Sequence, residues 1–154
     1  MGQTQFQDGR KFYVLPQAPE DAGYYTYGTP TGGAGQFSHP KMLTFLFLLI
    51  FRWGAFDSRK IGIGNISLAE GAPFPPHRSH TSGLEADIRP MRTDGRQLPV
   101  NRHDRLYDRE ATGRLVTIML DSGLVKRVMF NDSLIRGVNR LAGHDDHLHV
   151  EVKL

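Results

Sequence analysis

The distribution of histidine is the feature that most constrains how this chain of 154 residues can fold. Five of its seven histidines fall in two short strings, HRSH at residues 77–80 and HDDHLH at residues 144–149. Imidazole is the commonest metal ligand among side chains. We therefore expect a fold in which these two distant strings meet at one metal site.

The spacing inside each string supports this expectation. The segment HRSHTSGLEAD places an imidazole at His80 and a carboxylate at Asp87, with Gly83 between them to let the backbone turn. The segment HDDHLHVEV alternates like a β-strand, so His147 and His149 should project from the same face. Nitrogen and oxygen donors that converge from two strands suit zinc, and a fourth position left to water is typical of a catalytic zinc site.

Neither spacing is specific alone, because a His followed seven positions later by an Asp is expected about 0.5 times by chance in a chain of this composition. The longer strings carry more weight. The pattern Ser79-His80-x-x-Gly83-x-x-x-Asp87 with a distant His147-x-His149 resembles the lysostaphin-type and D-alanyl-D-alanine zinc peptidases. The fuller pattern, with His77, Leu84, Gly143 and His144 added, is similar to the penicillin-insensitive murein endopeptidases. The resemblance covers about three quarters of the chain, from about Ser38 to the end.

The resemblance implies a role for each matching position. The zinc ligands would be His80, Asp87 and His149. His147 would lie beside the metal-bound water as general base, or would stabilise the tetrahedral intermediate. His77 and His144 would line the cleft, where they polarise the scissile carbonyl or bind substrate.

Two arginines near these motifs, Arg78 and Arg89, are candidates for binding a carboxylate of a peptidoglycan stem peptide. Other residues have simpler interpretations. We expect His39 to be structural and His103 to be a solvated loop residue, and we expect Asp145 and Asp146 to form a solvated turn.

The composition limits which metal ligands and which binding partners we expect. The chain has no cysteine, so a metal must be held by histidine and carboxylate. Its 19 basic residues are scattered and nearly matched by 16 acidic ones, which argues against nucleic-acid binding. The net charge of +3 fits a weak attraction to an anionic polymer such as the bacterial cell wall. We expect one zinc peptidase domain over residues 1–154, and a monomer.

The N-terminal residues do not indicate how the protein would reach the cell wall. The first 17 residues lack the apolar core of a signal peptide, and Phe6 breaks the myristoylation pattern. The apolar run at residues 42–53 is shorter than the roughly 20 residues that cross a bilayer, so we expect a buried helix and no membrane insertion. We therefore expect action on the cell wall or in the periplasm after phage-encoded release or delivery by a secretion machine.

The hydrophobic pattern predicts a small α+β domain, with a central antiparallel sheet that carries the metal and helices packed on its other face. Residues 1–37 are loop-like and should pack on the domain. The resemblance adds a fold similar to the hedgehog and D-Ala-D-Ala peptidases. The predicted helices are 38–53, with Ser38 as N-cap, 108–120 and 132–138; the predicted strands are 61–68, one at Asp87, 125–130 and 147–154.

The leading functional hypothesis is a zinc-dependent peptidoglycan endopeptidase that cuts the cross-link from D-alanine to meso-diaminopimelate. A D,D- or L,D-carboxypeptidase that trims stem peptides is the alternative within the same chemistry. A zinc-stabilised cell-wall binding module without catalysis is the alternative from another class.

Overall fold

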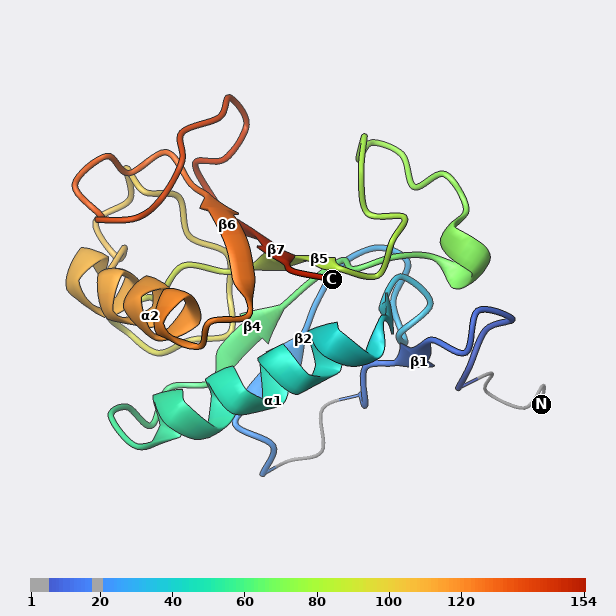
Figure 1. Cartoon of the computed structure of the whole chain (residues 1–154). Coiled ribbons are helices and arrows are strands. Elements are labelled where there is room, and N and C mark those ends of the chain that lie inside the picture. Colours follow the sequence, from blue (N-terminus) through green and yellow to red (C-terminus); the bar gives the residue numbers. More distant parts are fainter. Residues whose placement is uncertain (1–5, 18–20) are drawn as a thin grey trace.

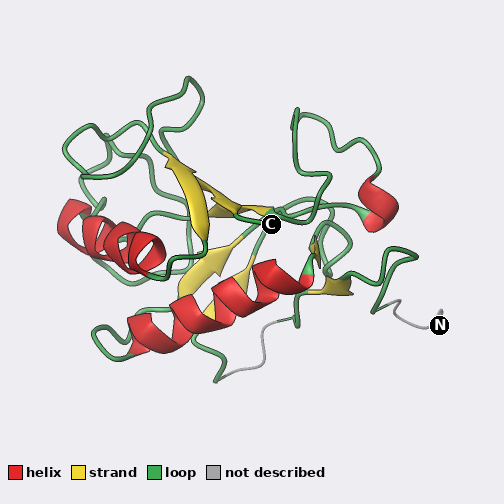
Figure 2. Cartoon of the chain, viewed as in Figure 1, coloured by secondary structure: helices red, strands yellow, loops and turns green. Residues whose placement is uncertain are grey.

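A five-stranded mixed sheet lies at the centre of the fold, in the order β2-β4-β5-β7-β6 (Figures 1 and 2). The computed structural model describes residues 6–17 and 21–154. A separate antiparallel pair joins β1 to β3 near the N-terminus. The strands are β1 (Tyr13–Val14), β2 (Tyr24–Thr26), β3 (Phe37–Ser38), β4 (Ile61–Ile63), β5 (Glu85–Ile88), β6 (Val125–Met129) and β7 (Leu148–Val152).

The pairing of β5 with β7 sorts side chains between the two faces of the sheet. The strands are antiparallel, and their register sets Asp87 opposite His149 and Ile88 opposite Leu148. Because side chains alternate along a strand, Asp87 and His149 share one face while Ile88 and Leu148 share the other. The second face is the core face, where Ile88 and Leu148 are fully buried. The alternation predicted for the last strand is confirmed.

Two helices cover the core face. Helix α1 (Pro40–Gly54) and helix α2 (Arg109–Asp121) pack against each other and against β7 and β6 respectively. Their buried side chains include Phe45, Leu46 and Trp53 from α1 and Leu115 and Met119 from α2. The predicted α+β domain is therefore confirmed, with Asp87 and His149 on the face of the sheet opposite the helices.

The first helix differs from the prediction at its start and in its burial. Its N-cap is His39, whose Nδ1 accepts from the Lys41 amide at 3.0 Å, because Ser38 is engaged in β3 opposite Tyr13. Only one side of the helix is buried, and Phe51 on the other side is 80% exposed. No helix in the described ranges is both long enough and apolar enough to cross a membrane.

Three other expectations are wrong in detail. The sheet is not wholly antiparallel, because β2 runs parallel to β4, and β2 comes from the segment predicted to be loop. The predicted strand 61–68 ends at Ile63, because Ile66 leaves the sheet and donates its amide to Gly35. The predicted helix 132–138 is a series of turns. There the Asp132 carboxylate accepts from the Leu134 amide at 3.1 Å, a local bond that competes with helix formation.

The open face of the sheet requires glycine at position 64. A Cβ built there would lie 2.5 Å from the Tyr27 ring, and the Arg89 guanidinium packs over that ring at 3.9 Å. Moving the ring away from position 64 would therefore disturb its contact with Arg89.

We expect Gly64→Ala to lower the free energy of unfolding by about 1–3 kcal/mol, because it overpacks this contact. The matched control is Gly54→Ala at the end of α1, where an added Cβ meets nothing within 4 Å. That substitution should be neutral or should stabilise by up to about 1 kcal/mol. Urea unfolding followed by circular dichroism measures both, and equal effects of the two substitutions would contradict the packing described here.

Candidate metal centre

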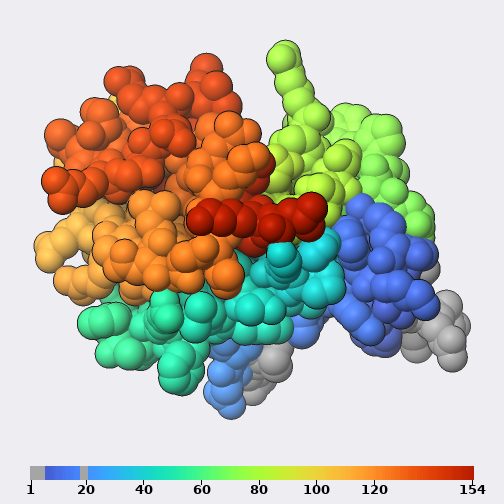
Figure 3. Space-filling model, viewed as in Figure 1, coloured from blue at the N-terminus to red at the C-terminus, as the bar shows by residue number. Residues whose placement is uncertain are grey.

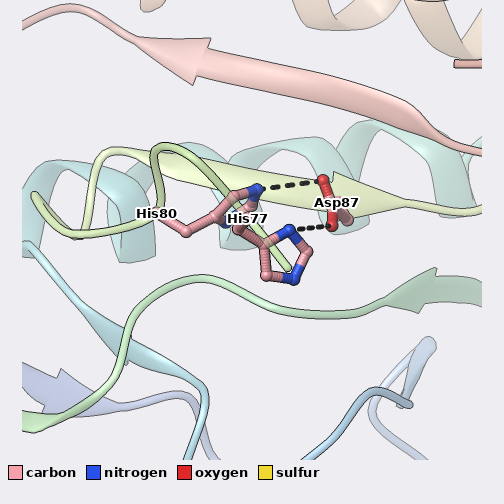
Figure 4. Close-up of side chains that lie close together, drawn as sticks. All are labelled: His77, His80 and Asp87. Atoms are coloured by element: carbon pink, nitrogen blue, oxygen red, sulfur yellow. Dashed lines mark ion pairs between the residues drawn. The ribbon is translucent and has the colours of Figure 1, made fainter. Parts of the chain in front are cut away.

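His77, His80 and Asp87 lie together on the open face of the sheet (Figure 4). Each offers a ligand atom within 4.8 Å of the others, so this group could hold a metal ion. His80 Nε2 is 3.2 Å from Asp87 Oδ1, and His77 Nδ1 is 4.0 Å from Asp87 Oδ2. Asp87 is fixed by β5, whereas both histidines come from the loop that follows the short 3₁₀ turn at Ala69–Gly71.

A turn at Gly83 brings the loop back to the strand. The residue has a φ of +71°, which favours glycine, and a Cβ there would lie 2.6 Å from the backbone nitrogen of His39. That nitrogen donates to the Gly83 carbonyl at 3.1 Å. The role predicted for Gly83 is therefore confirmed, and the turn also ties the loop to the start of α1.

The backbone fixes the orientation of the buried His80 ring. Its Nδ1 lies 2.9 Å from the Ile66 carbonyl oxygen. A carbonyl can only accept, so Nδ1 carries the proton, and the lone pair of Nε2 faces Asp87. A backbone carbonyl on the distal ring nitrogen is the arrangement typical of metal-ligating histidines.

The second histidine string reaches the same carboxylate from β7. His149 Nδ1 is 3.3 Å and His147 Nε2 is 3.8 Å from Asp87 Oδ1. The His144 ring packs tilted against His147, with a centroid separation of 4.7 Å, and edge-on against His149, at 5.7 Å. The structure thus brings four histidines of the two strings around Asp87 and the fifth, His144, against two of them.

Asp87 Oδ1 lies at the centre of this cluster. In the described part of the chain it is a buried oxygen without a hydrogen-bond partner, although imidazole nitrogens stand close to it. Ligands about 2.1 Å from a tetrahedral zinc are about 3.4 Å apart. The separations of Asp87 Oδ1 from the His80 and His149 nitrogens, 3.2 and 3.3 Å, match that value. The residues present therefore fit a divalent ion.

The cluster forms part of the wall of an open cleft of about 720 Å³. Both histidine strings line it, and Glu85, Arg127, Met129 and Leu141 lie among the other lining residues. The notch at the top of Figure 3 separates the segment that carries residues 77–80 from the segment around residue 141. Its volume falls within the range of about 300–1,000 Å³ that small-molecule sites have.

The two arginines predicted to bind substrate lie in different places. Arg78 is exposed and lines the cleft. Arg89 is not among the cleft-lining residues; its guanidinium packs over the Tyr27 ring at 3.9 Å and contacts Tyr25 Oη at 3.5 Å. Of the two, only Arg78 is placed to meet a ligand in the cleft. The expected structural role of His39 is confirmed by its N-cap bond, and His103 is exposed in a loop.

Neighbouring charges shift the pKa values in this centre. Burial alone would raise the pKa of Asp87, but the nearby imidazoles of His149 and His80 outweigh it and hold the pKa well below its usual value. Burial alone would lower the pKa of His149, but the carboxylates of Asp87 and Glu85 outweigh it and raise the pKa to about 9. Burial lowers the pKa of His77 and of His144, which favours their neutral forms.

Three contacts that hold these histidines were not predicted. Glu85 Oε1 is 3.4 Å from His149 Nε2, and Asn65 Nδ2 is 2.8 Å from His77 Nε2. Asp146 is exposed, as expected of a solvated turn residue, but its Oδ1 also lies 2.8 Å from His147 Nδ1. The spacing of Glu85 and Asp87, two positions apart on one strand, was a signal that could have placed both on the metal face.

Comparison of the chain with protein-family models gives no match, and comparison with curated proteins gives none either. The resemblance to murein endopeptidases therefore remains a prediction that depends on the two histidine motifs.

Metal binding should depend on the loop that carries His80 and on strand β5. We expect His80→Ala and Asp87→Asn each to weaken zinc affinity at least ~100-fold, because the first removes an imidazole donor and the second removes the negative charge of a buried ligand. His103→Ala, in an exposed loop, is the control and should bind as the wild type does. Competition with a chromophoric chelator measures all three; unchanged affinity in His80→Ala would contradict the site.

The metal-free protein should lose stability as the pH rises from 6.5 to 9. The pKa of His149 is about 9 in the folded chain against an ordinary value of 6.5. The stability that this proton contributes is therefore complete below pH 6.5 and is lost as the pH rises through 9. Thermal unfolding with chelator present should show a falling midpoint over this window, and His149→Gln should remove most of the slope. A midpoint that rises over the window in the wild type would contradict the assignment.

Proposed function

We propose that this chain is a zinc-dependent peptidase that hydrolyses the stem-peptide cross-links of bacterial peptidoglycan. The observation that carries the proposal is the buried, unpartnered Asp87 Oδ1, which is approached by nitrogens of both histidine strings at one wall of an open cleft. A structural metal site would be expected to be closed rather than to border such a cleft.

The proposed zinc ligands are His80, Asp87 and His149. Bound zinc would supply Lewis acidity toward a carbonyl oxygen and would lower the pKa of a bound water to about 7. The donor set supports zinc, because imidazole and carboxylate both suit this metal.

His77 is a neighbour of these ligands rather than one of them in this proposal. The Asn65 amide nitrogen can only donate, so His77 Nε2 accepts from it and the ring proton lies on Nδ1, the atom that faces Asp87. In this tautomer Nδ1 carries a proton and therefore cannot ligate a metal. We therefore assign His77 to the cleft, where it can polarise the scissile carbonyl or bind substrate.

His147 is the proposed general base. Asp146 Oδ1 accepts from His147 Nδ1, so the lone pair of Nε2 is directed toward Asp87 and the cleft. At this position His147 can take a proton at Nε2 and return it to the departing amine. His144 packs against His147 and supports the ring, and Arg78 at the cleft wall is available to bind a substrate carboxylate.

Several finer points of the proposal depend on the resemblance. It suggests the D-alanine to meso-diaminopimelate bond, a fold related to the hedgehog and D-Ala-D-Ala peptidases, and a place of action at the cell wall or in the periplasm. The endopeptidase is preferred over a carboxypeptidase because D-alanyl-D-alanine peptidases of this group often carry a Glu shortly before the last His. This chain has Asp145 and Asp146 there instead.

The test is digestion of purified sacculi with and without chelator. We expect the zinc-loaded protein to solubilise the sacculi by cutting cross-links, with loss of dimers in the muropeptide masses. His147→Gln should lower the rate about 10²–10⁴-fold, the range for loss of a general base, and should keep zinc affinity. His149→Ala should lose both hydrolysis and zinc binding.

Other outcomes would decide against parts of the proposal. Loss of a terminal D-alanine from monomers, without loss of dimers, would favour the carboxypeptidase. Zinc binding with no hydrolysis of any muropeptide would favour the binding module. Full activity of His147→Gln would contradict the role of that residue.

A further inference from the structure

Glu85 is a half-buried acidic residue, on the same face of the sheet as Asp87, that the proposed mechanism does not use. Its side chain is only 14% exposed although it lies on a strand that borders an open cleft. Buried carboxylates are rare unless they are paired. Its contacts connect the two histidine strings.

One carboxylate oxygen holds the first string. Glu85 Oε2 accepts from the backbone nitrogen of His80 at 2.6 Å. His80 has a φ of +61°, an uncommon conformation for a residue with a side chain, and such residues persist when their surroundings hold them. The bond from Glu85 therefore stabilises the backbone geometry that directs the His80 ring toward Asp87.

The other oxygen faces the second string. Glu85 Oε1 is 3.4 Å from His149 Nε2, while His149 Nδ1 faces Asp87 at 3.3 Å. The two nitrogens of one ring thus face two different carboxylates. A proton held on Nε2 by Glu85 leaves the lone pair of Nδ1 for the metal, as carboxylate partners do for ligating histidines in other zinc sites.

We infer that Glu85 is a positioning residue that orients both imidazole ligands of the metal, one through its backbone and one through its ring. The inference rests on the proposed ligands His80 and His149. It adds a second negative charge to that of Asp87, so that the two carboxylates together balance a divalent cation.

The chain provides a matched control at Glu151. This residue is the direct partner of Glu85 in the β5–β7 register and has a similarly small exposed fraction of 16%. Its carboxylate pairs with Lys126 and Arg127, and none of its described contacts is with a histidine. Substituting Glu151 therefore removes the same charge from the same region without touching the ligands.

The experiment measures the zinc affinities of the Glu85→Gln and Glu151→Gln variants of the whole chain, by chelator competition at one pH. Glutamine keeps one oxygen to accept from His80, but its amide group cannot accept from His149. We expect Glu85→Gln to weaken zinc binding about 10–100-fold, the usual effect of losing such a partner, and Glu151→Gln to leave it unchanged. The visible spectrum of the Co²⁺-loaded protein should change in Glu85→Gln alone, because the geometry of the His149 ligand is altered.

A second variant keeps the test decisive if Glu85→Gln folds poorly. Glu85→Asp keeps the charge but is one methylene shorter, so it cannot reach both histidines and should also weaken zinc binding. Equal affinity in the wild type and in either Glu85 variant would overturn the inference, as would equal losses in Glu85→Gln and Glu151→Gln. A wild type that binds zinc but digests no sacculi would instead contradict the proposed function and leave the role of Glu85 standing.

Discussion

The antiparallel pairing of β5 with β7 is the constraint on which the candidate centre depends. It sets Asp87 directly opposite His149, so a residue from the middle of the chain and one near its end share a face of the sheet. The core supports this register, because a shift by one residue would turn Ile88 and Leu148 out of the buried face and Asp87 into it. Core packing therefore also holds Asp87 and His149 in place on the opposite face of the sheet.

The loop that carries His77 and His80 is held by contacts of a different kind. Hydrogen bonds set its geometry, because the Ile66 carbonyl fixes the His80 ring and Glu85 fixes the His80 backbone. The buried Phe74 ring of the same loop also packs edge-on against both histidines. Arg10, from the N-terminal segment, adds a bond from its guanidinium to the Leu68 carbonyl at 3.1 Å. A rigid sheet thus supplies one side of the centre and a polar, bonded loop supplies the other.

The parts of the structure that could be predicted are those set by local pattern. Alternation predicted β7, helical spacing predicted α2, and the two histidine strings predicted which segments meet. The parts that could not be predicted depend on partners distant in sequence. Strand β2 is short and becomes a strand by pairing with β4, and Ile66 leaves its predicted strand to bond Gly35. The orientation of His77 likewise follows from its contact with Asn65, which the spacing of residues in the sequence does not predict.

The central claim is that one zinc ion is held by atoms from both histidine strings and keeps a position open to solvent. A crystal structure of the zinc-loaded protein, with anomalous diffraction at the zinc edge, tests it most directly. The account predicts a single ion bonded to His80 Nε2, Asp87 Oδ1 and His149 Nδ1, with a non-protein fourth ligand facing the cleft. An ion bound without His149, or one enclosed by four protein atoms, would contradict it.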